Sequence, residues 1–394
     1  MDINTLSPPN FEDTQIAFAT KSNWQLRKSY QLFKLFSSET LVSLGTKFTP
    51  LALKFHLPVT PFIKHTVYEQ FCGGETIAEC EKTINSLGAS GIKTILDYGI
   101  EGKATEKEYD AAVKHKLEII QFAKKNKHVT VMSAKVTGLA RFGLLEKMHA
   151  GKKLFASEEK EWQRVKERIH AISKACKEAD IQIYWDAEET WIQQPIDNLI
   201  DELMQHYNTE KAIVFNTIQL YCKNRLAYLM EAHQQAAKSG YVYGAKLVRG
   251  AYMEKERERA NTMRYPSPIH ENKHAVDRDY NAAIDYCLKN LDTLSFCCAS
   301  HNEYSNAYLA KRIDEKGIPR NHAHITFGQL YGMGENLTFN LAAAGYNALK
   351  LIPYGPVKDV IPYLLRRAQE NSSVGGQVSR ELMLLKKEIK RRHC

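Results

Sequence analysis

The sequence predicts an α/β protein whose centre is a closed barrel of eight parallel strands. From Thr94 onward, short apolar or β-branched runs alternate with helical stretches. Most of these runs begin about 30 residues apart, which is the size of one strand–helix unit. Strands that alternate with helices indicate a parallel sheet. Eight such units favour a (β/α)8, TIM-like barrel over an open sheet.

Eight runs carry the strand pattern. In chain order they are Thr94–Tyr98, Val129–Val136, Ile181–Glu188, Ala212–Gln219, Tyr243–Gly250, Leu294–His301, His324–Leu330 and Ala348–Tyr354. Two longer gaps, from 129 to 181 and from 243 to 294, leave room for extra helices. The competing fold is a doubly wound sheet that binds a dinucleotide. No run is followed by G-x-G-x-x-G, because Gly332-Met333-Gly334 lacks the third glycine.

Helices are predicted on both sides of the barrel. Before it, apolar residues recur at helical spacing in Trp24–Phe36, Thr40–Phe55, Pro61–Phe71 and Glu75–Leu87. After it, Val360–Asn371 is typical of a helix. We therefore expect an N-terminal helical segment (1–90), a barrel with a C-terminal helix that covers the substrate (91–375), and a basic amphipathic helix or tail (376–394).

Composition excludes several classes of protein. No run of about 20 apolar residues is present, so no membrane span is predicted, and the N-terminus has no secretory signal. Eight cysteines without a C-x-x-C pair indicate reduced thiols in a cytoplasmic protein.

The net charge of +9 is partly concentrated in the C-terminal LLKKEIKRRHC. Basic patches interleaved with aromatic residues are lacking, so nucleic acid is not an expected partner. A solvated tail and a contact with anionic lipid both remain open for the basic end.

Polar side chains recur where the predicted strands end. Lys135, Asp186, Gln219, Lys246 and Ser300-His301-Asn302 follow this pattern in successive strands. Polar groups inside apolar strands cost several kcal/mol unless they are satisfied. Function in such barrels lies at the carboxyl ends of the strands. The alternative for each residue alone is an internal salt bridge, for example between Lys135 and Asp186.

The helix after the last strand carries two adjacent arginines. Tyr363, Arg366, Arg367 and Glu370 share one face of it, at positions i, i+3, i+4 and i+7. Forked guanidiniums suit bidentate capture of a carboxylate. The alternative is a solvated face on which Glu370 is a local salt-bridge partner.

The residues alone leave the reaction undecided. There is no G-x-S-x-G motif of a hydrolase. His322 and His324 precede the seventh strand, at the wrong end of the barrel, so no metal is expected. Lys135 could form a Schiff base, as in barrel aldolases. A charged Lys135 beside Asp186 would instead bind a small anionic substrate together with the two arginines.

Five motifs together resemble the proline dehydrogenase family. They are KLVRGAYMEKER (246–257), YGPVKDVIPYLLRRAQEN (354–371), WDAEE (185–189), IQLYCK (218–223) and CASHN (298–302). The resemblance covers roughly residues 60–375. It implies a distorted (β/α)8 barrel, preceded by helices, in which non-covalently bound FAD oxidises L-proline to Δ1-pyrroline-5-carboxylate.

The resemblance also implies roles for residues around the substrate. Arg366 and Arg367 would clamp the proline carboxylate, with Lys135 as a third cation. Asp186 would hold this constellation and Glu370 would orient the arginines. The family's remaining pocket positions correspond to Tyr354 against the proline ring, to Tyr252, Tyr363 and Leu330 in the walls, and to Glu101, which would pair with Arg366.

Cofactor contacts and electron transfer are implied in the same way. FAD contacts would come from Gln219, Lys246, Gly250 and the Ser300-His301-Asn302 turn. Family members pass electrons to a membrane quinone, which would suit a cytoplasmic enzyme peripheral to the inner face of the membrane, with the basic segment 378–392 as contact. No second catalytic module follows the barrel, so we expect a monofunctional enzyme. The alternatives are a 4-hydroxyproline dehydrogenase and a Schiff-base aldolase that uses Lys135.

Overall fold

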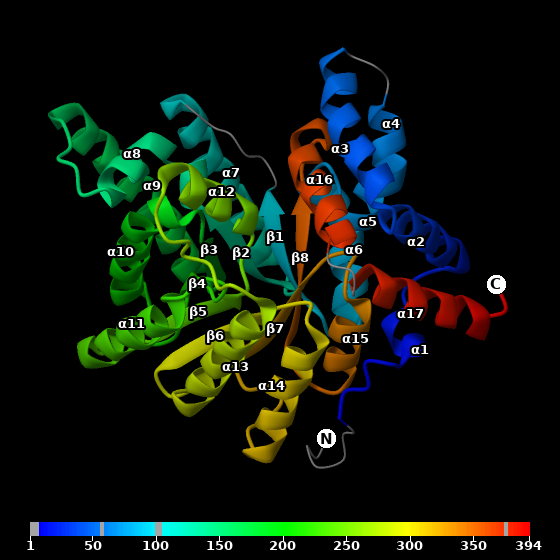
Figure 1. Ribbon diagram of the computed structural model, residues 1–394. Helices are drawn as coiled ribbons and strands as arrows, with labels where there is room; N and C mark the ends of the chain where they lie inside the picture. Colours follow the sequence, from blue (N-terminus) through cyan, green and yellow to red (C-terminus); the bar gives the residue numbers. More distant parts are fainter. Residues whose placement is uncertain (1–7, 56–58, 99–104, 374–376) are drawn as a thin grey trace. The chain divides into compact units, whose positions relative to one another are not determined.

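A computed structural model of the protein describes residues 8–55, 59–98, 105–373 and 377–394 (Figure 1). The side chains of residues 39, 50–54, 370–373 and 377 lie outside the description. The chain forms two compact units, residues 1–101 with 329–394, and residues 102–328.

The eight strands follow one another in sequence order around a closed barrel. They are β1 (Lys93–Tyr98), β2 (Val129–Lys135), β3 (Gln182–Asp186), β4 (Val214–Gln219), β5 (Tyr243–Val248), β6 (Leu294–Ala299), β7 (Ile325–Leu330) and β8 (Ala348–Tyr354). The paired strands run parallel, from β2 through β7 and from β8 to β1. The predicted barrel is therefore confirmed, and every strand lies within two residues of its predicted end.

The helices of the second unit alternate with its strands. They are α7 (Glu106–Lys125), α8 (Phe142–His149), α9 (Ala156–Ala179), α10 (Thr190–Tyr207), α11 (Arg225–Ser239), α12 (Met253–Met263), α13 (Lys273–Lys289) and α14 (Glu303–Glu315), with a 3-10 turn, η3, at Val136–Gly138. The two long gaps each hold an extra helix, α8 with α9 and α12 with α13. The gap lengths had predicted this addition.

The first unit contains β1, β8 and the helices at both ends of the chain. These helices are α1 (Thr14–Ala17), α2 (Asn23–Phe36), α3 (Glu39–Lys54), α4 (Thr60–Ile63), α5 (Glu69–Phe71), α6 (Ile77–Ala89), α15 (Glu335–Ala343), α16 (Val357–Ser373) and α17 (Gln377–Arg391), with a π-helix, η2, at Lys64–Tyr68. Among the described residues, no helix is long and apolar enough to cross a membrane.

The helices of the first unit share one apolar core. Phe33, Phe36 and Phe71 pack with ring centroids 6.0–6.2 Å apart, and Leu364 and Leu384 join the same cluster. The core therefore combines α2, α5, α16 and α17, which are far apart in sequence. Burial of such side chains is worth about 1.5–3 kcal/mol each, so this packing stabilises α16 in its place.

The C-terminal helix α17 covers its apolar face with protein. Leu384 and Leu385 are buried, and the helix lies beside α1 and α2 (Figure 1). Glu388 is fully buried and accepts hydrogen bonds from Arg391 and Arg392, while Arg392 Nη2 donates to the carbonyl of Phe18 at 2.8 Å. The apolar face that this amphipathic helix would offer to lipid is therefore already packed against protein. The helical pattern predicts such a face but not what covers it.

Candidate active site

The end of β3 and the middle of β5 are joined by an ion pair inside the barrel. Lys246 Nζ donates to Asp186 Oδ1, and Lys246 is only 7% exposed. The ring of Tyr184, also on β3, lies 5.9 Å from the ammonium. A salt bridge between Lys135 and Asp186 was the alternative that the sequence left open to a functional role. Lys135 lies opposite Asp186 in the β2–β3 register, so Asp186 is flanked by one lysine and hydrogen-bonded to another.

Glu188 follows Asp186 and is the most strongly perturbed acid near this pair. Burial raises the pKa of Glu188 to about 7, although hydrogen bonds from Thr137 and the charge of Lys135 oppose the shift. The Thr137 amide donates to Glu188 Oε1 at 3.0 Å, and the Thr137 hydroxyl donates to Oε2. A carboxyl group with a pKa of about 7 therefore interacts electrostatically with Lys135. Glu188 is not among the residues predicted from the sequence, where its only signal is its place in the DAEE motif.

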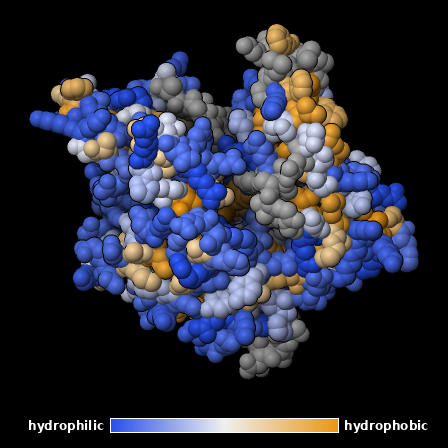
Figure 2. All heavy atoms as spheres, viewed as in Figure 1, coloured by the Kyte–Doolittle hydropathy of each residue, from blue (hydrophilic) through white to orange (hydrophobic). Residues whose placement is uncertain are grey.

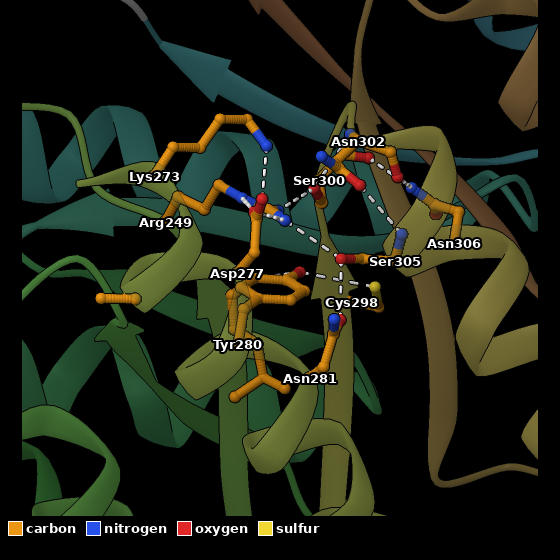
Figure 3. Close-up of polar contacts among 12 residues, drawn as sticks. Arg249, Lys273, Asp277, Tyr280, Asn281, Cys298, Ser300, Asn302, Ser305 and Asn306 are labelled. Atoms are coloured by element: carbon orange, nitrogen blue, oxygen red, sulfur yellow. Dashed lines mark hydrogen bonds and ion pairs between the residues drawn. The ribbon is translucent and has the colours of Figure 1, made fainter.

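Arg249, directly after β5, organises a second polar cluster (Figure 3). Its Nε and Nη2 donate to Asp277 Oδ1 at 3.0 and 2.6 Å. Its Nη1 donates to Ser300 Oγ at 2.7 Å, and its Nη2 donates to Ser305 Oγ at 3.0 Å. The guanidinium also lies 4.4 Å from the centroid of the Tyr280 ring. Arg249 is not among the site residues predicted from the sequence, because its partner Asp277 lies on α13, 28 residues further along the chain.

The Ser300-His301-Asn302 turn is fixed by the helix that follows it. Asn302 caps α14 by accepting from the Ser305 amide at 2.9 Å, and its own amide donates to Ser300 Oγ at 3.1 Å. Asn306 Nδ2 donates to the carbonyls of Ser300 and Asn302 at 3.0 and 2.8 Å. Figure 3 shows these side chains converging on the turn beside Arg249. The end of β6 is thus held rigid.

Gly250 gives β5 a bare, exposed backbone at its end. Its φ of +143° is unfavourable for other residues, and a Cβ there would lie 2.3 Å from the Tyr221 ring. Nearby, Gln219 Nε2 donates to the Glu188 carbonyl at 2.7 Å and ties the end of β4 to that of β3. A ligand can therefore approach the backbone between two anchored strand ends.

The first unit presents the residues of the predicted clamp. Val360 and Leu364 belong to the apolar core and Tyr363 packs against it, whereas Arg366 and Arg367 on the same helix are half-buried. The Arg367 guanidinium lies 5.1 Å from the Tyr363 ring centroid. The two arginines are thus neither fully solvated nor part of the apolar core.

Tyr354 is held by a close approach of two chain segments. It is 1% exposed, and its ring centroid lies 5.2 Å from that of Tyr98. Beside it, the Gly73 amide donates to the Pro353 carbonyl at 2.9 Å. A Cβ on Gly73 would lie 2.4 Å from the Ile352 side chain, so the glycine permits this approach and the turn after β8 is fixed.

The structure describes two of the remaining predicted residues, Tyr252 and Leu330. Tyr252 is half-buried at the start of α12, and Leu330 ends β7. The Leu330 carbonyl accepts from Lys350 Nζ at 3.1 Å. Glu101 and the side chain of Glu370 lie outside the described residues. The predicted site residues that the structure describes therefore form two sets, one near the strand ends of the second unit and one at Leu330, Tyr354 and α16 of the first.

Comparison with known proteins identifies the family. The family model described as proline dehydrogenase matches residues 80–380. The chain belongs to the proline dehydrogenase family. It is therefore an oxidoreductase, and both the resemblance and the enzyme class expected from the sequence are confirmed. This membership decides against the aldolase.

Relatives match most of the chain. Proline dehydrogenase 1, mitochondrial, of Dictyostelium discoideum is 32% identical, over 98% of this chain and 77% of its own length. Hydroxyproline dehydrogenase of Xenopus laevis is 30% identical, over 95% and 88%. The crystal structure of proline utilization A from Bdellovibrio bacteriovorus, inactivated by N-propargylglycine, matches with a TM-score of 0.71 at 19% identity. That match covers 96% of this chain but 41% of the solved chain, and it supports the fold alone.

The residues of the second unit suit the flavin that this family uses. A flavin needs hydrogen-bond donors around its ring and close backbone approach near its phosphates. Lys246 and Gln219 are buried donors on neighbouring strands. Gly250 offers the bare backbone, and Arg249 adds a cation beside it. The donor set therefore fits the cofactor.

Proposed function

We propose that the protein oxidises L-proline to Δ1-pyrroline-5-carboxylate with non-covalently bound FAD, as the first step of proline catabolism to glutamate. The observation that carries this proposal is the buried Lys246–Asp186 pair with Lys135 in register beside it. Two lysines at the strand ends suit an anionic substrate and a flavin ring that becomes electron-rich on reduction. Family membership supplies the oxidoreductase class.

The chain's own residues bind and orient the substrate. We assign the proline carboxylate to Arg366 and Arg367, whose forks can grip both oxygens, and to Lys135 as a point charge. The carboxylate does not react, so gripping it fixes the orientation of the ring and of C5. Tyr354, Tyr252, Tyr363 and Leu330 would form the walls, and Glu101 and Glu370 would pair with the arginines.

The cofactor residues hold the group that accepts electrons. FAD supplies a two-electron acceptor, which no side chain can replace. Gln219, Lys246, Gly250 and the Ser300-His301-Asn302 turn would bind it. In the reaction, the C5–H bond breaks with its electron pair, the nitrogen lone pair forms the C5=N bond, and the nitrogen releases its proton to water. The amine must be neutral beforehand, so turnover should rise towards mildly alkaline pH.

We propose a membrane quinone as the final electron acceptor, with peripheral contact between protein and bilayer. The compartment expected from the sequence is the cytoplasm, whereas the Dictyostelium relative is named as mitochondrial. Both settings would offer a quinone-containing membrane. Fractionation of the native source, with the protein followed by antibody, distinguishes them.

A second substrate, 4-hydroxyproline, is the competing proposal. The Xenopus hydroxyproline dehydrogenase is nearly as similar as the proline dehydrogenase of Dictyostelium. Tyr354 favours proline, because its phenol would crowd a substituent on C4. Comparable kcat/KM values for the two substrates would overturn this preference.

The proposal is tested with an absorbance spectrum of the purified protein, followed by anaerobic addition of L-proline. We expect a flavin spectrum that bleaches, with the imine product trapped by o-aminobenzaldehyde. Lys246→Met should weaken flavin binding, whereas Lys255→Met, on the exposed face of α12, should not. A protein that takes up no FAD, or a flavin that stays oxidised with proline, would overturn the proposal.

A further inference from the structure

The first unit carries a large apolar groove that the proposed reaction does not use. It has a volume of about 980 Å³ and is lined by α2, α3, α4, η2 and one face of α16. Its lining includes Leu35, Leu41 and Leu364. Figure 2 shows orange side chains gathered over this layer of helices, at the upper right. Contiguous apolar surface of this kind marks a site of interaction.

Three aromatic side chains project from this surface. Trp24 is 66% exposed, Phe48 is 60% exposed and Phe62 is 72% exposed. All three line the groove, yet each presents most of its ring to solvent. Protruding rings suit insertion into a soft apolar phase better than the enclosure of a small rigid ligand. Trp and Phe are also the residues that interfacial helices present to the acyl boundary of a bilayer.

The charge of the same segment selects the occupant. Residues 22–75 contain six Lys and Arg and three acidic residues. Two of these acids, Glu69 and Glu75, are ion-paired with Lys28 and Lys64. Arg27, Lys34 and Lys47 are exposed on α2 and α3, the helices that also carry Trp24 and Phe48. Basic side chains beside exposed aromatic residues match a surface of anionic lipid, which attracts Lys and Arg within a Debye length.

The back of the groove is the helix that carries the arginine pair. Ile361, Leu364 and Leu365 line the groove, whereas Arg366 and Arg367 follow them on α16. An occupant of the groove therefore touches the helix to which we assign the substrate carboxylate. The alternative basic surface, α17, packs Leu384 and Leu385 inside the protein.

We propose that this groove docks the protein onto the surface of an anionic lipid bilayer. Trp24, Phe48 and Phe62 enter the acyl boundary. Arg27, Lys34 and Lys47 meet the lipid phosphates. The inference extends the proposed reduction of a membrane quinone, since it supplies the surface at which enzyme and bilayer meet. The two can fail separately, because vesicle binding needs no turnover and a water-soluble short-chain quinone needs no vesicle.

The test is co-sedimentation of the full chain with phosphatidylcholine vesicles, with and without phosphatidylglycerol. We expect binding to the anionic vesicles that weakens as salt is raised. The Trp24→Ala/Phe48→Ala/Phe62→Ala variant should bind these vesicles more weakly than the wild type, by a factor on the order of ten or more. Phe155→Ala, an exposed aromatic of the second unit, should bind normally. Circular dichroism confirms that the variants are folded.

A matched pair of charge variants separates the groove from the C-terminal helix. Lys34→Gln/Lys47→Gln should weaken binding, whereas Lys386→Gln/Lys390→Gln, which removes the same charge from α17, should not. Equal loss in both pairs would overturn the proposal. So would unchanged binding of the aromatic triple variant, or no binding by the wild type. Sedimentation velocity detects the other occupants. The bilayer would be rejected as the occupant if the groove instead mediated a dimer. The same holds if it bound an acidic amphipathic peptide in place of vesicles.

Discussion

Lys246 on β5 and Asp186 at the end of β3 form an ion pair although β4 lies between their strands. The pair therefore crosses the interior of the barrel. Both side chains are largely removed from water, with 9% and 21% of their surfaces exposed. Taking two charges out of water is compensated only while both are present. This pair thus links the stability of the barrel to the proposed flavin site.

Breaking this pair from one side should destabilise the protein. Lys246→Met leaves Asp186 without its ammonium, and we expect the free energy of unfolding to fall by about 3 kcal/mol. Urea denaturation of the flavin-free protein measures it. Lys246→Arg keeps the charge and should lose far less. The double change Lys246→Met/Asp186→Asn should cost less than the sum of the single changes. Additive losses would show that the pair does not couple.

Glu188 should make the protein less stable as pH rises. Burial raises its pKa from the usual 4.5 to about 7, so the folded state binds more protons than the unfolded state between these values. Stability therefore falls as pH rises from 4.5 to 7. Glu188→Gln should remove up to about 3 kcal/mol of this loss. Urea midpoints at pH 5 and pH 8 measure the change. If the variant gains no stability over wild type between them, the assignment to Glu188 is wrong.

The strand–helix rhythm predicted the barrel because each strand is a short apolar run and each helix is long enough to recognise. The partner of Asp186 could not be predicted, since an internal contact depends on which side chains point inward from strands that are not neighbours. The role of Arg249 could not be predicted for a related reason, because its partner Asp277 lies on a helix remote in sequence. The amphipathic pattern of 378–392 predicted a helix there, but not that α2 would cover the apolar face of α17.

The contacts of Glu388 with Arg391 and Arg392, which hold α17 in place, should weaken in acid. Burial opposes ionisation of Glu388, but hydrogen bonds from Arg391 and Arg392 lower its pKa to about 2. The folded state therefore binds fewer protons than the unfolded state between about 4.5 and 2, and the stabilisation is lost as pH falls through this range. Glu388→Gln should bring the same loss at neutral pH, by about 2 kcal/mol. Hydrogen exchange should then accelerate in α1 and α17 but not in α13. Unchanged exchange in α17 would show that these contacts do not hold it in place.

The arginine helix provides the sharpest test of the proposed substrate site. Arg366→Ala or Arg367→Ala removes charge-assisted hydrogen bonds to a carboxylate, each worth about 1.5–3 kcal/mol. We therefore expect the KM for proline to rise on the order of 10- to 100-fold, while flavin absorbance stays unchanged. Lys358→Gln, which removes an exposed cation from the same helix, is the matched control and should leave KM unaltered. Arg367→Lys should recover little, because an ammonium cannot reproduce the fork. If either alanine variant keeps the wild-type KM, that arginine does not hold the carboxylate, and an equal rise in Lys358→Gln would reduce the effect to the net charge of α16.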